Sequence, residues 1–64
     1  MKILVVGGGG REHAIIKKIK ENKSVEKIYA LPGNGGIAHD AECVAIKADD
    51  IKGITDFAVK NGID

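Results

Sequence analysis

Residues 5–14, Val-Val-Gly-Gly-Gly-Gly-Arg-Glu-His-Ala, place four consecutive glycines between an apolar run and a charged segment. Glycine loses more conformational freedom on folding than any other residue, so four together need a physical reason. A strand that turns through glycines into a helix forms an anion site, because free N–H groups and the positive end of the helix dipole converge there. We interpret Gly8, Gly9 and Gly10 as points of close ligand approach. The alternative is a tight turn in which glycine only supplies positive φ or close packing.

The segments on either side of the glycines predict a β-α-β unit. Residues 2–6 have the apolar character of a parallel strand that is covered on both faces. A helix is expected over residues 11–23, and a second strand over residues 25–31, where β-branched and aromatic side chains gather. The buried stripe of the helix is expected to consist of its apolar residues Ala14, Ile15, Ile16 and Ile19.

The second half of the chain predicts a loop, a helical turn, a short strand and a second long helix. Residues 32–36, Pro-Gly-Asn-Gly-Gly, form a loop; residues 37–40 suit one helical turn; and residues 42–47 suit a short third strand. Asp49 or Asp50 is a good N-cap for a second long helix. The residues expected on the buried side of this helix are Ile51, Ile54, Phe57 and Ala58.

The end of the chain indicates that the architecture continues. Gly62 is placed as a C′ glycine that ends the second helix, and Ile63 suits the first residue of a further buried strand. We therefore predict an α/β fold, an incomplete Rossmann-like unit that starts as parallel β-α-β. A chain of 64 residues without disulfides also buries only a small core, which agrees with a part of a larger domain.

Composition excludes several classes of protein. A net charge of +1 provides no basic surface for nucleic acid and no basic helix for a membrane. The longest apolar run, residues 3–6, is too short for a membrane span or a signal peptide. Cys43 is the single cysteine, so no internal disulfide can form, and we expect a reducing, cytoplasmic location.

Three charged or polar side chains follow the glycines. Arg11 could grip a phosphate or a carboxylate beside the helix N-terminus, or it could be solvated or paired with a nearby carboxylate. Glu12 lies in the first helical turn, where capping of free N–H groups is its expected role and ligand contact the alternative. His13 has no Ser or Cys partner nearby in the sequence, and we expect a structural histidine.

The loop after the second strand is the second candidate site. Pro32, Gly33 and Asn34 lie at the same carboxyl edge of a parallel sheet as the glycines, where ligands bind in open α/β folds. The Asn34 side chain could bond a sugar or an amine, or it could simply shape the turn. Further polar residues show no metal-ligand spacing and are expected to be surface and strand residues: His39, Asp40, Glu42 and Cys43.

The common nucleotide motifs do not fit. A G-x-G-x-x-G frame that starts at Gly7 or Gly8 reaches Glu12 or His13 in place of its third glycine. No acidic residue ends the second strand to hold a ribose, and the Lys-Ser/Thr pair of a P-loop is absent. The sequence therefore disfavours a dinucleotide site and a P-loop.

The segments MKILVVGGGGREHAI and VEKIYALPGNGGIA, taken together, closely resemble the amino terminus of the phosphoribosylamine–glycine ligase family. The resemblance implies that residues 1–64 are the N-terminal part of a pre-ATP-grasp domain and that the remainder of the enzyme is absent. This family often has a small residue such as Ser where this chain has Gly8, an exchange that we expect to leave backbone contacts intact. Related domains of other purine carboxylate–amine ligases share the fold but typically lack R-E-H-A.

The resemblance also implies a reaction. The family joins glycine to 5-phosphoribosylamine in purine biosynthesis, using ATP and Mg²⁺ or Mn²⁺, through a glycyl phosphate. The ATP and metal sites would lie in the absent ATP-grasp part, so we expect no catalytic or metal-binding residue and no activity in residues 1–64 alone. The implied contribution of this segment is to bind phosphoribosylamine, through the backbone of Gly8 to Gly10 and a facing wall of Pro32, Gly33 and Asn34. A stand-alone module that binds a phosphorylated sugar or nucleotide is the alternative.

Overall fold

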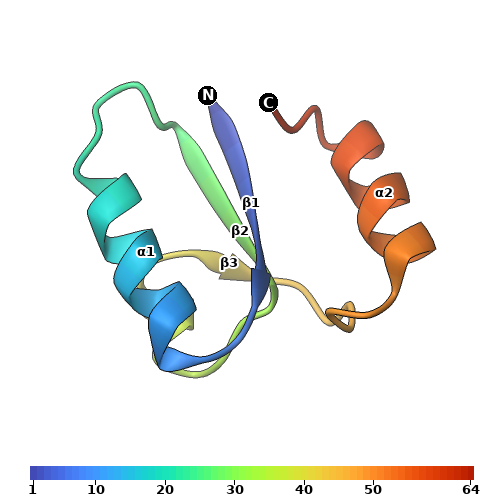
Figure 1. Ribbon diagram of the computed structural model, residues 1–64. Helices are drawn as coiled ribbons and strands as arrows, with labels where there is room; N and C mark the ends of the chain where they lie inside the picture. The colour runs from blue at the N-terminus through green and yellow to red at the C-terminus, as the bar shows by residue number, and fades with distance from the viewer.

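A computed structural model describes residues 1–64 as a three-stranded parallel sheet, ordered β1-β2-β3, with a helix on either side (Figure 1). The elements in chain order are β1 (Lys2–Gly7), α1 (Gly10–Lys20), β2 (Lys27–Pro32), the one-turn 3₁₀ helix η1 (Ile37–His39), β3 (Glu42–Cys43) and α2 (Ile51–Lys60). Helix α1 connects β1 to β2, as a right-handed parallel crossover requires. The predicted α/β fold with a parallel β-α-β start is confirmed.

The register of the first two strands places their carboxyl ends side by side. Lys2 pairs with Lys27 at one end of the ladder, and Gly7 pairs with Pro32 at the other. Because the strands are parallel and in step, the loops that follow them leave the sheet at the same edge. We call residues 7–10 the glycine loop and residues 32–36 the PGN loop.

The core lies between α1 and the sheet. It is formed by the side chains with the least exposure on that face, which are Ile16 of α1, Ile28 and Ala30 of β2, and Ile37 of η1. Ile16 is 0% exposed and Ile19 packs at the edge of the cluster, whereas Ala14 and Ile15 are exposed. The predicted stripe of α1 is therefore narrower than expected, because at 3.6 residues per turn Ala14 lies nearly opposite Ile16 on the helix.

Helix α2 covers the other face of the sheet less closely (Figure 1). Phe57 packs edge-on against Tyr29 of β2, with ring centroids 5.0 Å apart, and no residue of α2 is fully buried. Ile51 is 78% exposed, so its predicted place on the buried side is wrong; the other three predicted residues are half-buried. The prediction that β1 is covered on both faces also fails in part, because Val6 is 43% exposed.

Several element boundaries differ from the sequence-based expectation. Helix α1 ends at Lys20 because turns follow, with the Asn22 N–H donating to the Ile19 carbonyl at 2.9 Å. Strand β3 is limited to two residues, since a 2.7 Å bond from the Ile46 N–H to the Val44 carbonyl folds the chain away from the sheet. Asp50 caps α2, and Gly62 has the positive φ of 63° expected of a C′ glycine.

The chain after α2 returns to the outer edge of β1. The Asp64 N–H donates to the Lys2 carbonyl at 2.9 Å, and the Lys2 N–H donates to the Asp64 carboxylate at 2.7 Å. None of the helices has the length and apolar character needed to cross a lipid bilayer.

Candidate functional site

The two candidate loops are joined directly by hydrogen bonds. The Gly33 N–H donates to the Gly7 carbonyl at 3.0 Å, and the Asn34 side-chain amide donates to the Gly8 carbonyl. These bonds continue the β1–β2 ladder past the last strand residues, so the loops form one surface. The structure therefore brings together the two sets of residues that the sequence singled out.

Two of the four glycines are required by the chain itself. Gly7 has φ of 134°, a conformation that side chains disfavour, and a Cβ there would overlap the Glu12 carboxylate. A Cβ at Gly8 would overlap the Gly33 carbonyl oxygen. A side chain at position 8 would therefore require the PGN loop to move, whereas Gly8 lets the two loops approach closely.

The other two glycines have no such requirement. Gly9 has φ of −94°, and a Cβ there would only make ordinary contact with Glu12 at 3.7 Å. A Cβ at Gly10 would meet no atom within 4 Å. Both residues are exposed, and neither has positive φ, so the turn does not explain why they are glycines.

Gly9 and Gly10 form the start of α1, where backbone donors remain free. The first helical hydrogen bond runs from the His13 N–H to the Gly9 carbonyl at 3.1 Å, so the three preceding amides of the helix have no acceptor in the chain. Glu12 accepts from the Gly9 N–H at 3.5 Å, in agreement with its expected capping role. Arg11 is exposed and forms no ion pair, so its charge is free beside these amides.

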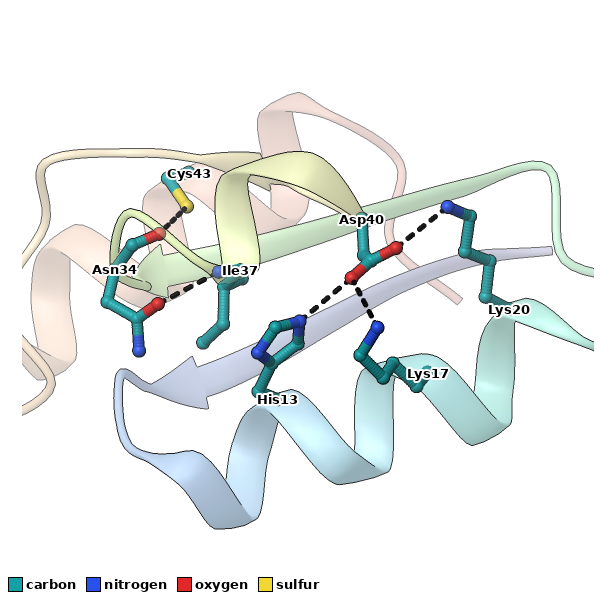
Figure 2. A network of polar contacts seen from close by, with 7 residues as sticks. All are labelled: His13, Lys17, Lys20, Asn34, Ile37, Asp40 and Cys43. Carbon is teal, nitrogen blue, oxygen red and sulfur yellow. Dashed lines mark hydrogen bonds and ion pairs between the residues drawn. The ribbon is translucent and has the colours of Figure 1, made fainter.

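Both polar groups of the Asn34 side chain form hydrogen bonds, of which Figure 2 shows the one at Oδ1. Its Oδ1 accepts from the Ile37 N–H at 2.8 Å, which starts η1, while its amide nitrogen reaches the glycine loop. Its own carbonyl lies 3.5 Å from the Cys43 thiol. Asn34 thus shapes the turn and ties the loops together, and a direct contact with a sugar or amine stays a prediction. The exposed Pro32 and half-buried Gly33 flank it at the same edge.

An ionic cluster, which we call the Asp40 cluster, joins α1 to the residues after η1 (Figure 2). The Asp40 carboxylate lies 2.8 Å from His13 Nε2, 2.9 Å from Lys20 Nζ and 3.5 Å from Lys17 Nζ. Hydrogen bonds from His13 and then Lys20 hold the pKa of Asp40 well below its usual range. His13 is the structural histidine that was expected.

Sequence reasoning missed the role of Asp40, which it assigned to the surface. A signal was present on α1, where His13, Lys17 and Lys20 follow each other at helical spacings of four and three. Three hydrogen-bond donors on one helix face indicate a common acceptor opposite that face. The sequence does not say which of the many carboxylates would supply it.

Metal ligands do not gather in this chain. No group of three His, Cys, Asp or Glu side chains is arranged to hold a metal ion, and the Asp40 carboxylate already pairs with His13, Lys17 and Lys20. The residues present therefore do not fit a catalytic metal, and we assign no metal-dependent step to residues 1–64.

Comparison with known proteins agrees with the geometry. The family described as Phosphoribosylglycinamide synthetase, N domain, matches residues 1–64. The phosphoribosylamine–glycine ligase of Caldanaerobacter subterraneus is 56% identical over 64 residues, and that of Clostridium acetobutylicum is 50% identical. Both matches cover 100% of this chain but 15% of the relative, so the chain spans about a seventh of their length. The chain belongs to the phosphoribosylglycinamide synthetase N-domain family.

Proposed function

We propose that this chain is the N-terminal part of a pre-ATP-grasp domain in an ATP-dependent carboxylate–amine ligase that joins glycine to 5-phosphoribosylamine in purine biosynthesis. The family match over all 64 residues and the names of the relatives support this proposal. The chain spans 15% of those relatives, and the residues that carry out the chemistry are proposed to lie in the rest of the longer polypeptide.

The proposed reaction has two steps. The carboxylate of glycine attacks the γ-phosphorus of ATP, which gives glycyl phosphate and ADP. The amine of phosphoribosylamine then attacks the acyl carbon and displaces inorganic phosphate, which leaves an amide and releases one proton. ATP with Mg²⁺ or Mn²⁺ would bind outside residues 1–64, where the cation would neutralise charge on the transferred phosphoryl group.

The proposed role of this segment is to hold the phosphoribosyl end of the amine. Free amides at the start of α1, the helix dipole and the Arg11 guanidinium supply donors and positive charge for a phosphate. The observation that carries the proposal is that Gly9 and Gly10 lack a structural reason to be glycine. Close approach of a ligand to their backbone explains why side chains are missing there.

Substitutions in the complete ligase polypeptide test this role. Gly10→Val places its side chain in open space, so we expect unchanged thermal stability and a KM for phosphoribosylamine that rises at least about tenfold. Arg11→Ala should raise the same KM by about tenfold, because a charge-assisted contact is lost. The KM values for ATP and glycine should change little, since both substrates would bind elsewhere.

Two controls define the outcome. Lys18→Ala removes an exposed cation from the same helix away from the loops and should leave all three KM values unchanged. Gly7→Ala should instead lower stability, because its backbone and its neighbour Glu12 exclude a Cβ. A normal KM for phosphoribosylamine in stably folded Gly10→Val and Arg11→Ala enzymes would contradict the proposal.

A further inference from the structure

The His13 side chain occupies the space between the start of α1 and the PGN loop (Figure 2). Its backbone N–H donates to the Gly9 carbonyl, so the backbone of this residue is attached to the glycine loop. Its ring faces Gly36 of the PGN loop, since a Cβ added to that glycine would stand 3.4 Å from the ring atom Cε1. The imidazole therefore lies beside the PGN loop, while its backbone belongs to the helix that starts at the glycine loop.

Asp40 fixes the orientation of this ring. The 2.8 Å contact to Nε2 comes from a carboxylate whose side chain is 13% exposed, and the His13 side chain is 25% exposed. The Asp40 N–H also donates to the Ile37 carbonyl at 2.8 Å, which closes the η1 turn. Asp40 thus connects the imidazole to the same turn that Asn34 starts through its bond to the Ile37 N–H.

These contacts connect the segments of the two loops through side chains from different elements. The first connection is the hydrogen bond from the Asn34 amide to the Gly8 carbonyl. The second is the hydrogen bond between His13 of α1 and Asp40. The PGN loop is linked to the glycine loop by the hydrogen bonds of Gly33 and Asn34, while Asp40, which follows η1, is linked to α1 through His13. A shift of η1 would change the distance between the walls of the proposed phosphoribosyl site.

We propose that His13, oriented by Asp40, is a positioning residue for phosphoribosylamine: its ring sets the separation of the glycine loop and the PGN loop. The proposal rests on the proposed function. The proposal assigns His13 no contact with the substrate, since its Nε2 bonds Asp40 and its ring faces Gly36. Its effect passes through the positions of Gly9, Gly10 and Asn34.

Three variants of the complete ligase polypeptide test the proposal. His13→Leu keeps an apolar body of similar size but removes the nitrogen that meets Asp40, and it should raise the KM for phosphoribosylamine by about tenfold. His13→Gln carries an amide that can donate to Asp40 from near the position of Nε2, so it should restore most of that loss. Lys17→Met removes another, exposed partner of the same carboxylate and should leave the KM unchanged.

A change confined to the KM for phosphoribosylamine distinguishes a positioning role from a general structural role. We expect the KM values for ATP and glycine, and kcat at saturating phosphoribosylamine, to stay within about twofold of the unsubstituted enzyme in every variant. An equal rise of all KM values, a normal KM for phosphoribosylamine in folded His13→Leu, or failure of His13→Gln to restore it would overturn the proposal. If His13→Leu does not fold, Asp40→Ala decides in its place, because it keeps the ring and removes its partner; a normal KM there overturns the proposal as well.

The Gly10→Val and Arg11→Ala enzymes separate this inference from the proposed function. If they raise the KM for phosphoribosylamine and His13→Leu does not, only the positioning role of His13 fails. If all three leave that KM unchanged, the loops do not bind phosphoribosylamine and the proposed function of this segment fails.

Discussion

The two helices of this chain begin in opposite ways. Helix α2 starts at Asp50, whose carboxylate accepts from the Gly53 N–H at 2.9 Å and so satisfies a free donor of the first turn. Helix α1 starts at Gly9, which has no side chain to cap it, and its first amides point outward without acceptors. Both helices have free N–H donors in the first turn, and only in α2 does a side chain of this protein accept a hydrogen bond from one of them.

The packing of the two helices shows the reverse pattern. Helix α1 buries Ile16 completely and is tied to η1 through the Asp40 cluster, whereas α2 has no buried residue and leaves Val59 79% exposed. The helix with the open N-terminus is therefore the one that is held firmly in place. A preorganised anion site requires unsatisfied donors that are held rigidly, because little conformational entropy is then lost when the ligand binds.

The largest test of this contrast shortens one apolar side chain on each helix in turn. Ile16→Ala should destabilise the fold by about 2–5 kcal/mol, because it leaves a cavity between α1 and the sheet. Val59→Ala on α2 should change stability by less than about 0.5 kcal/mol, since the side chain is exposed. Hydrogen exchange of the β2 amides in the complete polypeptide measures both; similar losses of protection in the two variants would show that α2 is packed as tightly as α1.

Much of this contrast was present in the sequence, because local chemistry determines it. The strand–glycine–helix order, the Asp50 cap and the Gly62 terminus follow from backbone and side-chain preferences that act over a few residues. The parallel register then brings the ends of β1 and β2 together, and with them the glycine loop and the PGN loop. The fold class and the adjacency of the two candidate loops could thus be predicted.

Features that depend on tertiary contacts could not be predicted. The sequence does not show that a side chain is excluded at Gly7 and Gly8 but has room at Gly9 and Gly10. This difference depends on the positions of Glu12 and Gly33 in the folded chain. The role of Asp40 likewise depends on η1 folding back over α1, which no periodicity reveals. Ile51 shows the opposite error: its spacing places it with the apolar residues of α2, but its side chain is 78% exposed.

A smaller effect is expected from the cap of α2. Asp50→Ala should lower the stability of this helix by about 1 kcal/mol, because the Gly53 N–H loses its acceptor. Asp49→Ala is the matched control, since it removes the neighbouring carboxylate, whose side chain accepts no hydrogen bond, and it should have a smaller effect. Amide exchange in the first turn of α2 measures both variants; equal effects would mean that general charge near the helix N-terminus, rather than the cap, stabilises it.

The smallest effect concerns the attachment of α1 and its dependence on pH. Bonding from His13 and then Lys20, with Lys17 close by, keeps the pKa of Asp40 below its unfolded value of about 3.9. A carboxyl with a lowered pKa contributes its full stabilisation above the unfolded pKa and loses it as the pH falls toward the folded one. Acidification below about pH 4 should therefore weaken protection of the η1 amides, and only modestly, because Lys17 and Lys20 are more than half exposed and screened by solvent.

Asp40→Asn provides the comparison, because its side chain stays neutral at every pH. In the complete polypeptide we expect η1 of this variant to be less protected than the unsubstituted protein at pH 6, and the difference to shrink as the pH falls toward 3. The amides of the first turn of α2 serve as an internal reference, since no residue of the Asp40 cluster touches that helix. A difference between the two proteins that stays constant from pH 6 to pH 3 would show that the charge of Asp40 does not hold η1 to α1. The hydrogen bonds of Gly33 and Asn34, with the His13 ring beside Gly36, would then hold the PGN loop without a contribution from that charge.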